Sequence, residues 1–98
     1  MTASHALDQT AILRLSTDVT VQELGGSEGG VVLNLKSGEM YTVNETAIAF
    51  LQSLNGEISI AQAAEKIVND FEVTRDVLIA DLIELSNQLR HEGLISGR

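Results

Sequence analysis

Few residues of this chain have the side-chain chemistry that catalysis or metal binding requires. Its two histidines, His5 and His91, stand far apart, and cysteine is absent. Transition metals prefer imidazole and thiolate ligands at short, regular spacings, and no such spacing occurs here. Nucleophilic catalysis needs a Ser or Thr beside a His that an acidic group orients, whereas the acidic residues are scattered along the chain. The sequence therefore indicates no metal, no cofactor and no enzyme.

A glycine-rich run over residues 25–30 is the other feature that could do chemistry, because such loops can cradle phosphate groups. The run contains no lysine, and a strand pattern follows it where a phosphate-binding loop would open a helix. We interpret it as a turn.

The charge balance limits the partners. Six Lys and Arg against fourteen Asp and Glu give a formal net charge of −8 at pH 7. A surface of this sign repels both the phosphates of nucleic acids and anionic membranes. The chain also has neither a long apolar stretch nor a signal-peptide pattern. The sequence thus predicts a cytoplasmic protein that binds neither nucleic acid nor membrane.

The elements that must position a site follow from the periodicity of the apolar residues. A length of 98 residues allows one domain, and we expect a flexible tail over residues 1–10 and a domain over 11–98. Alternating apolar residues predict a first strand over 12–23, bent at Thr17–Asp18. A hairpin is expected from strands 31–36 and 39–43, with a tight turn at Ser37–Gly38.

The apolar period changes from two to about 3.6 at Asn44, which is a good N-cap. Ser59 and Gln62 form a capping box for a second helix, and Thr74 can cap a third. The expected helices cover residues 45–54, 60–70 and 75–92, after which 94–95 fold back on the core. The fold class is therefore α+β, a three-stranded antiparallel sheet followed by three helices, with helix-turn-helix connectivity between the last two.

Three short motifs, in this order and spacing, resemble the PqqD-like proteins. They are Val32–Gly38, Tyr41–Ala47 and Gly93–Ile95. In that family a strand ending in a Ser-Gly turn precedes an aromatic strand, a helix start and a closing Gly-Leu. The resemblance covers roughly residues 12–96, and Val43 stands where the family usually has Leu.

The resemblance implies a winged helix-turn-helix fold and a role as a RiPP recognition element. Such elements bind the leader segment of a ribosomally synthesised precursor peptide and present it to a maturation enzyme, such as a leader protease or a radical SAM enzyme. The family includes the chaperone of pyrroloquinoline quinone synthesis and stand-alone partners of lasso-peptide leader proteases. The quinone branch typically has a Pro-Glu pair where this chain has Ser37-Gly38-Glu39, and proline is absent here. The lasso branch, or another peptide branch, is therefore favoured.

A small sheet leaves edges whose unpaired backbone groups can accept an extended peptide as another strand. We expect strand 39–43 to be that edge and the third helix, to which the resemblance points, to form the wall of the groove. On this helix Leu78, Leu82, Leu85 and Leu89 form a core stripe, and a second line beside it carries two isoleucines, a serine and an arginine. Cations at Lys36, Arg75 and Arg90 would meet carboxylates of the peptide. The expected peptide-binding residues are Glu39, Met40, Tyr41, Thr42, Val43, Arg75, Ile79, Ile83, Ser86 and Arg90.

Each of these assignments has a structural alternative. Ile79 and Ile83 can pack in the core without touching a peptide, Tyr41 can be a structural aromatic, and Arg90 can simply favour the end of its helix. We assign Asn44 and Thr46 to capping.

Two other functions, and a dimer, stay open at this point. A winged-helix DNA-binding regulator would fit the connectivity, but the expected third helix carries more acidic than basic residues. A purely structural subunit of an enzyme complex is the other alternative. The free strand edge can also pair two copies of the chain into a homodimer.

Overall fold

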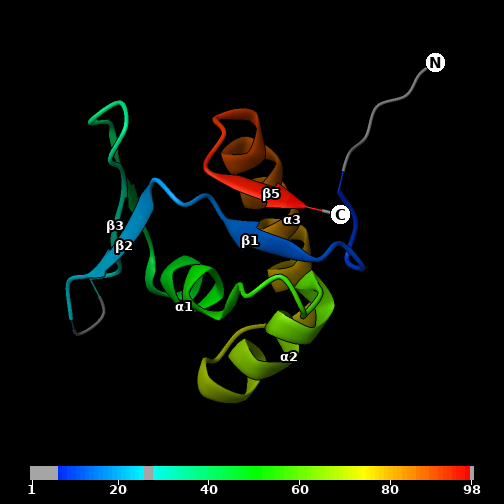
Figure 1. Cartoon of the computed structure of the whole chain (residues 1–98). Helices are drawn as coiled ribbons and strands as arrows, with labels where there is room; N and C mark the ends of the chain where they lie inside the picture. Colours follow the sequence, from blue (N-terminus) through cyan, green and yellow to red (C-terminus); the bar gives the residue numbers. More distant parts are fainter. Residues whose placement is uncertain (1–6, 26–27, 98) are drawn as a thin grey trace.

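The computed structural model describes residues 7–25 and 28–97. This part of the chain is α+β, with the three helices and the three-stranded antiparallel sheet that the sequence predicts, and with a second small sheet besides (Figure 1). The elements in chain order are β1 (Leu13–Leu15), β2 (Val19–Glu23), β3 (Gly30–Asn34), β4 (Met40–Val43), α1 (Glu45–Ser53), α2 (Ile60–Asp70), α3 (Arg75–His91) and β5 (Ile95–Gly97).

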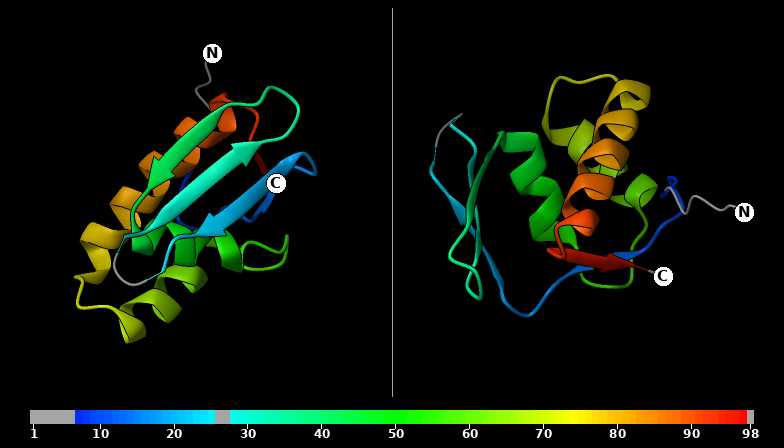
Figure 2. Two further views of the ribbon diagram at one scale, coloured as in Figure 1. Left: turned by 90° about the vertical axis from the view of Figure 1, so that its left-hand side faces the viewer. Right: turned by 90° about the horizontal axis from the view of Figure 1, so that it is seen from above.

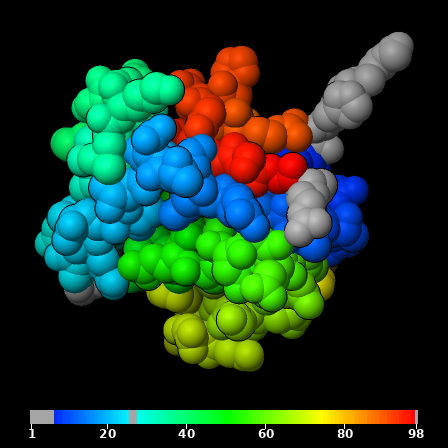
Figure 3. Space-filling model, viewed as in Figure 1, coloured from blue at the N-terminus to red at the C-terminus, as the bar shows by residue number. Residues whose placement is uncertain are grey.

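The larger sheet has the order β2-β3-β4, so β3 is central and β4 lies at an edge, as predicted. The tight turn expected at Ser37–Gly38 is wrong, because β3 ends at Asn34 and β4 begins only at Met40. The longer turn is held by Asn34, whose Oδ1 accepts hydrogen bonds from the amides of Lys36 at 2.9 Å and Ser37 at 3.3 Å. α1 packs behind β2 and β3, and Figure 2 shows the helices together on one side of the sheet. The tip of the β3–β4 hairpin projects from the molecule in the space-filling view (Figure 3).

The single bent strand expected over 12–23 is wrong, because its two halves belong to different sheets. β1 pairs antiparallel with β5, with Leu13 opposite Gly97 and Leu15 opposite Ile95, whereas β2 pairs with β3. A turn closed by the hydrogen bond from the Val19 amide to the Ser16 carbonyl, at 3.1 Å, lets the chain leave one sheet for the other. The return of residues 94–95 to the core is confirmed, since both are buried.

The predicted helix starts are local features, and the structure contains them. Asn44 caps α1 by accepting a hydrogen bond from the Ala47 amide at 2.9 Å. Ser59 and Gln62 form the reciprocal capping box of α2. Thr74 is the N-cap of α3, but its side chain makes no capping hydrogen bond, so only the position of that cap is confirmed.

The core lies between the sheets and the three helices. Its largest fully buried apolar side chains are Phe50, Leu13, Leu51, Ile60, Leu82, Leu94 and Val32. Of the expected core stripe on α3, Leu78, Leu82 and Leu89 are buried, whereas Leu85 is only partly buried. Leu85 therefore lies at the boundary between the core and the surface.

Part of the expected N-terminal tail bonds to the helices. Residues 1–6 are outside the described residues, but Leu7 and Gln9 each make a hydrogen bond to a helix. The Leu7 amide donates to Asn87 Oδ1 at 3.2 Å, and the Ala61 amide donates to the Gln9 carbonyl at 2.9 Å. We therefore propose that the domain begins near residue 7 rather than at residue 11.

The glycine-rich run closes as a turn, with the Leu24 amide donating to the Gly29 carbonyl at 2.9 Å; positions 26 and 27 are outside the described residues. None of the helices among the described residues has both the length and the apolar composition that a membrane span requires.

Candidate functional site

The free edge of β4 is defined by its hydrogen-bond register with β3. The Asn34 amide donates to the Glu39 carbonyl at 2.9 Å, which makes these two residues a hydrogen-bonded pair. Bonded and non-bonded pairs alternate along an antiparallel ladder, so Tyr41 is the next bonded position. The N–H and C=O groups of Met40 and Thr42 therefore point away from β3, toward the open edge.

The side chains of β4 also alternate, between solvent and the helices. Met40 and Thr42 are exposed, the former at 66% of its surface, whereas Tyr41 and Val43 are partly buried and pack against the core. Met40 therefore contributes its backbone to the edge while its side chain faces outward. Only one of Tyr41 and Met40 can face the helices, and the structure shows that it is Tyr41.

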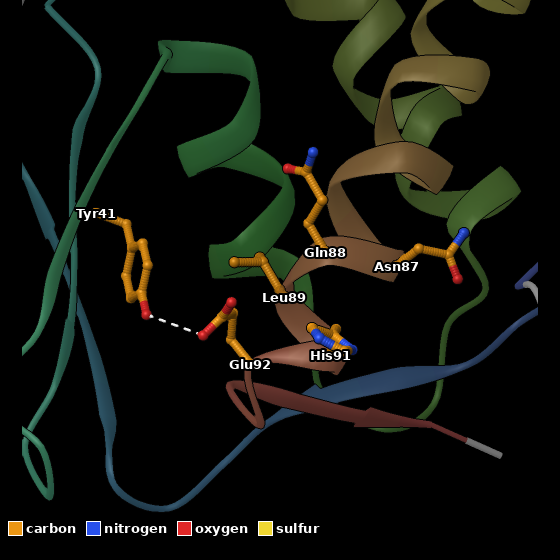
Figure 4. Close-up of a pocket in the computed structure, with 6 residues that line it drawn as sticks. All are labelled: Tyr41, Asn87, Gln88, Leu89, His91 and Glu92. Atoms are coloured by element: carbon orange, nitrogen blue, oxygen red, sulfur yellow. Dashed lines mark hydrogen bonds between the residues drawn. The ribbon is translucent and has the colours of Figure 1, made fainter.

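Three cavities lie along α3, and β4 lines two of them. The largest, about 600 Å³, lies between Tyr41 and the last turn of α3, where Leu89 and Glu92 point toward the phenol ring (Figure 4). The next, about 260 Å³, lies between Val43 and Leu85. The third, about 360 Å³, continues past the start of α1 to Val77. We call these three neighbouring cavities together the β4–α3 groove.

The length of this groove fits a short extended peptide. The fifteen steps along α3 from Val77 to Glu92 span about 22 Å at 1.5 Å per residue. An extended chain advances about 3.3 Å per residue, so about six or seven residues would fill it. The groove thus has the dimensions of a strand laid along β4.

The wall of the groove is a different flank of α3 from the one expected. Its main line is Asp81, Leu85, Gln88 and Glu92, spaced by four, three and four residues, with Glu84 beside them; Asn87 and His91 also line the wide end. At about 100° per residue, Ile79 and Ile83 lie close to half a turn around the helix from Asp81. Both isoleucines are partly buried and pack against the core. The structure thus favours their alternative role as core residues and places them outside the groove.

The expected cations also lie away from the groove. Arg75 forms an ion pair with Glu65 of α2, which places this flank of α3 against α2. Arg90 lies on that same flank, about 60° around the helix from Arg75 and partly buried. Lys36 is in the exposed turn of the hairpin. None of the three lines a groove cavity.

Ser86 is the clearest departure among the expected site residues. Its side chain is fully buried, and its Oγ has no hydrogen-bond partner. It is therefore inaccessible to a peptide at the surface, because the expected groove line on α3 faces the protein's interior.

We expect Ser86→Ala to stabilise the fold by about 1 kcal/mol, because an unsatisfied buried hydroxyl costs about 1–3 kcal/mol and alanine is the better helix former. Urea unfolding measures this change. A matched Ser53→Ala variant should be destabilised, since the Ser53 hydroxyl donates to the Phe50 carbonyl at 2.6 Å. A loss of stability in Ser86→Ala would show that the hydroxyl has a partner.

The wide end of the groove, beside Tyr41 and Glu92, carries negative charge. The Tyr41 hydroxyl lies 3.3 Å from Glu39 Oε1 and 3.4 Å from Glu92 Oε1, and its single hydrogen can be donated to only one of them at a time. Lost hydration, and then the negative charges of Glu39 and Glu92, raise the pKa of the Tyr41 phenol above its ordinary value of 10.0. Tyr41 is therefore protonated at neutral pH and acts as a hydrogen-bond donor.

The titration of Tyr41 provides a direct check of this geometry. The chain has one Tyr and no Trp, so the ultraviolet absorbance of tyrosinate reports this group alone. We expect a midpoint above the ordinary pKa, and Glu92→Gln should lower it because one negative charge is removed. Because the folded pKa is raised, the contribution of Tyr41 to stability is present below pH 10 and is lost as the pH rises through the folded value. Glu84→Gln, a change on the same helix away from the phenol, should leave the midpoint unchanged.

Other kinds of site find little support in the described residues. Across residues 7–25 and 28–97, no three His, Asp or Glu side chains gather closely enough to hold a metal ion. On the exposed side of α3 and its C-cap, the acidic residues Asp76, Asp81, Glu84 and Glu92 outnumber Arg75, which is paired with Glu65, so this side lacks the basic surface that a duplex-reading helix needs.

The comparisons with known proteins cover the segments of the chain that form both sides of the groove. The family model of coenzyme PQQ synthesis protein D (PqqD) matches residues 29–95, which include β4 and α3. A solved structure titled lasso peptide synthetase B1 complexed with the leader peptide is similar to this chain, with a TM-score of 0.68 and 28% sequence identity. The match covers 86% of this chain and 96% of that one. A search among curated proteins gives no match.

Proposed function

This chain belongs to the PqqD family, and on that basis we propose that it is a RiPP recognition element. It binds the leader segment of a ribosomally synthesised precursor peptide as a further strand on β4, beside α3. It then presents the peptide to a maturation enzyme and performs no catalysis itself. We expect the protein in the cytoplasm, where such precursors are made.

The observation that carries the proposal is the open edge of β4 beside the β4–α3 groove. The outward N–H and C=O groups of Met40 and Thr42 can each pair with the backbone of a guest, which gives affinity with little demand on the guest's sequence. Guest side chains at alternate positions would enter the groove and give selectivity. Of the expected contacts, Glu39 and the four residues of β4 keep this role; on α3 we replace the expected residues by Asp81, Leu85, Gln88 and Glu92.

The similarity to a lasso peptide synthetase B1 solved with its leader peptide supports this class of guest. The Ser37-Gly38-Glu39 turn and the absence of proline support the lasso branch over the quinone branch. A leader protease is therefore the maturation enzyme that we propose first, and a radical SAM enzyme is the alternative.

Isothermal titration with synthetic leader peptides encoded beside this chain's gene tests the proposal. We expect saturable binding of one peptide per chain. A scrambled peptide of the same composition is the control, because backbone pairing alone would bind it weakly whereas the groove selects side chains. Failure of every neighbouring leader to bind would contradict the proposal.

The protein concentration distinguishes peptide binding from self-association. A homodimer formed through β4 would occupy the same edge, so the apparent affinity for peptide would fall as the protein concentration rises. Sedimentation at the same concentrations reports the oligomeric state directly. If the chain stays monomeric and its affinity for the peptide stays constant, then no second copy of the chain competes with the leader peptide for the β4 edge.

A further inference from the structure

The wide end of the groove, at Tyr41 and Glu92, combines an apolar wall with acidic side chains. Tyr41 and Leu89 supply apolar surface to a cavity of about 600 Å³, which exceeds the volume of any single side chain. Glu92 stands in the same cavity, and Glu39 reaches the Tyr41 hydroxyl from the hairpin side. In the free protein, the carboxylates of Glu39 and Glu92 therefore both lie beside a single donor, the hydroxyl of Tyr41.

The remaining groove has the same charge. Asp81 and Glu84 line the central cavity, and Glu45 lines the third. Among the described residues that line the three cavities there is no Lys or Arg, and the one His is His91, at the wide end. Any guest carboxylate in the groove would meet like charges at short range, which disfavours it, whereas a guest cation would find several partners.

We infer that the groove selects a guest with a long basic side chain opposite Tyr41 and an apolar side chain two residues away. This inference rests on the proposed strand addition and specifies its substrate class. A guest strand on β4 places every second side chain on the Tyr41 and Val43 face. The stem of an Arg or Lys packs on the Tyr41 ring and Leu89, and its charged end reaches Glu39 and Glu92. The apolar side chain fills the narrower cavity between Val43 and Leu85.

This reverses the charge preference that the sequence suggested. There, Arg90 and Arg75 would meet carboxylates of the guest, but both lie on the flank of α3 that faces away from the groove. The wall that the structure presents is acidic, and a cation on the guest peptide would complement it.

A random peptide library displayed on phage, selected on the purified full chain, tests the inference without knowledge of the natural leader. We expect selected peptides to be enriched in Arg or Lys two positions from an apolar residue. For the strongest peptide, replacing that basic residue by Glu should weaken binding about tenfold, as expected for a charged hydrogen bond.

Charge reversal in the protein is the complementary arm. Glu92→Lys should weaken binding of the basic peptide about tenfold and restore binding of its Glu-substituted version, which a merely structural role of Glu92 would not do. Glu92 caps the end of α3, where a cation is favourable, so the fold should tolerate the change. Glu57→Lys makes the same charge change in the loop between α1 and α2, lines none of the groove cavities and should leave both affinities unchanged.

The outcomes separate this inference from the proposed function. Selected peptides that need an intact β4 edge but show no basic preference, or an acidic one, would overturn the inference and leave the strand addition in place. Selected peptides that bind equally well when Thr42 is replaced by Pro would overturn both.

Discussion

Replacement of Thr42 by proline is expected to weaken leader-peptide binding by about tenfold to hundredfold, measured by isothermal titration. The Thr42 amide points away from β3 toward the open edge, and proline has no N–H to donate there. The guest carbonyl that it would have bonded is left unsatisfied, at a cost of about 1–3 kcal/mol. The proline ring also occupies the space of the guest strand.

The variant should keep its fold, because proline is tolerated at the edge of a sheet when its nitrogen faces solvent. Thr42→Ala is the matched control: it removes the exposed side chain but keeps the amide, and its affinity should stay close to that of the parent chain. Equal weakening in the two variants would point to the side chain and would contradict the register that we assign to the guest.

Gly29→Ala is expected to lower the free energy of unfolding by about 2–5 kcal/mol, since a left-handed backbone costs about 1–2 kcal/mol and overpacking about 1–3 kcal/mol. Gly29 has a φ of +77°, and a Cβ there would lie 2.1 Å from the Val43 carbonyl oxygen and 2.9 Å from the Asn44 Cα. Both neighbours are backbone at the corner where β4 leads into α1. The corner must move, so peptide affinity should fall as well.

Gly38→Ala separates the two causes. Gly38 has nearly the same φ, +81°, but nothing lies within 4 Å of the position that a Cβ would take. Its cost should therefore be only that of the left-handed conformation, about 1–2 kcal/mol. Urea unfolding of both variants measures the difference. Equal losses at the two positions would mean that the crowding against Val43 is relieved without cost.

Pairing with a second copy of the chain is the main process that would compete with peptide binding at the β4 edge. Edge strands are usually protected by charge, short length or coverage, and β4 is short, with Glu39 beside it. The acidic groove adds a further barrier to a second copy, because each chain carries a net charge of −8. A basic guest strand would be repelled neither by the acidic residues at the edge and in the groove nor by the net charge of the chain.

The sequence by itself determined the parts of this fold that depend on neighbours in the chain. Asn44 and the Ser59–Gln62 pair act over three residues, so their types specify the starts of α1 and α2. The existence of the hairpin was local too, but its turn depends on Asn34 rather than on Ser37–Gly38 alone. The hairpin in turn makes β4 the last strand before the helices, which left it at an edge.

Only the tertiary structure decided which flank of α3 faces that edge. Helical periodicity identifies the stripe that meets the core, but the stripe has two flanks, and both carry apolar residues: Ile79 and Ile83 on one, Leu85 on the other. The choice is made by how α3 packs on α2, where Arg75 pairs with Glu65, and by the pairing of β1 with β5 across some eighty residues of chain. Contacts between residues so distant in sequence leave no local period, so the position of the acidic wall, and the burial of Ser86, became visible only once the chain was folded.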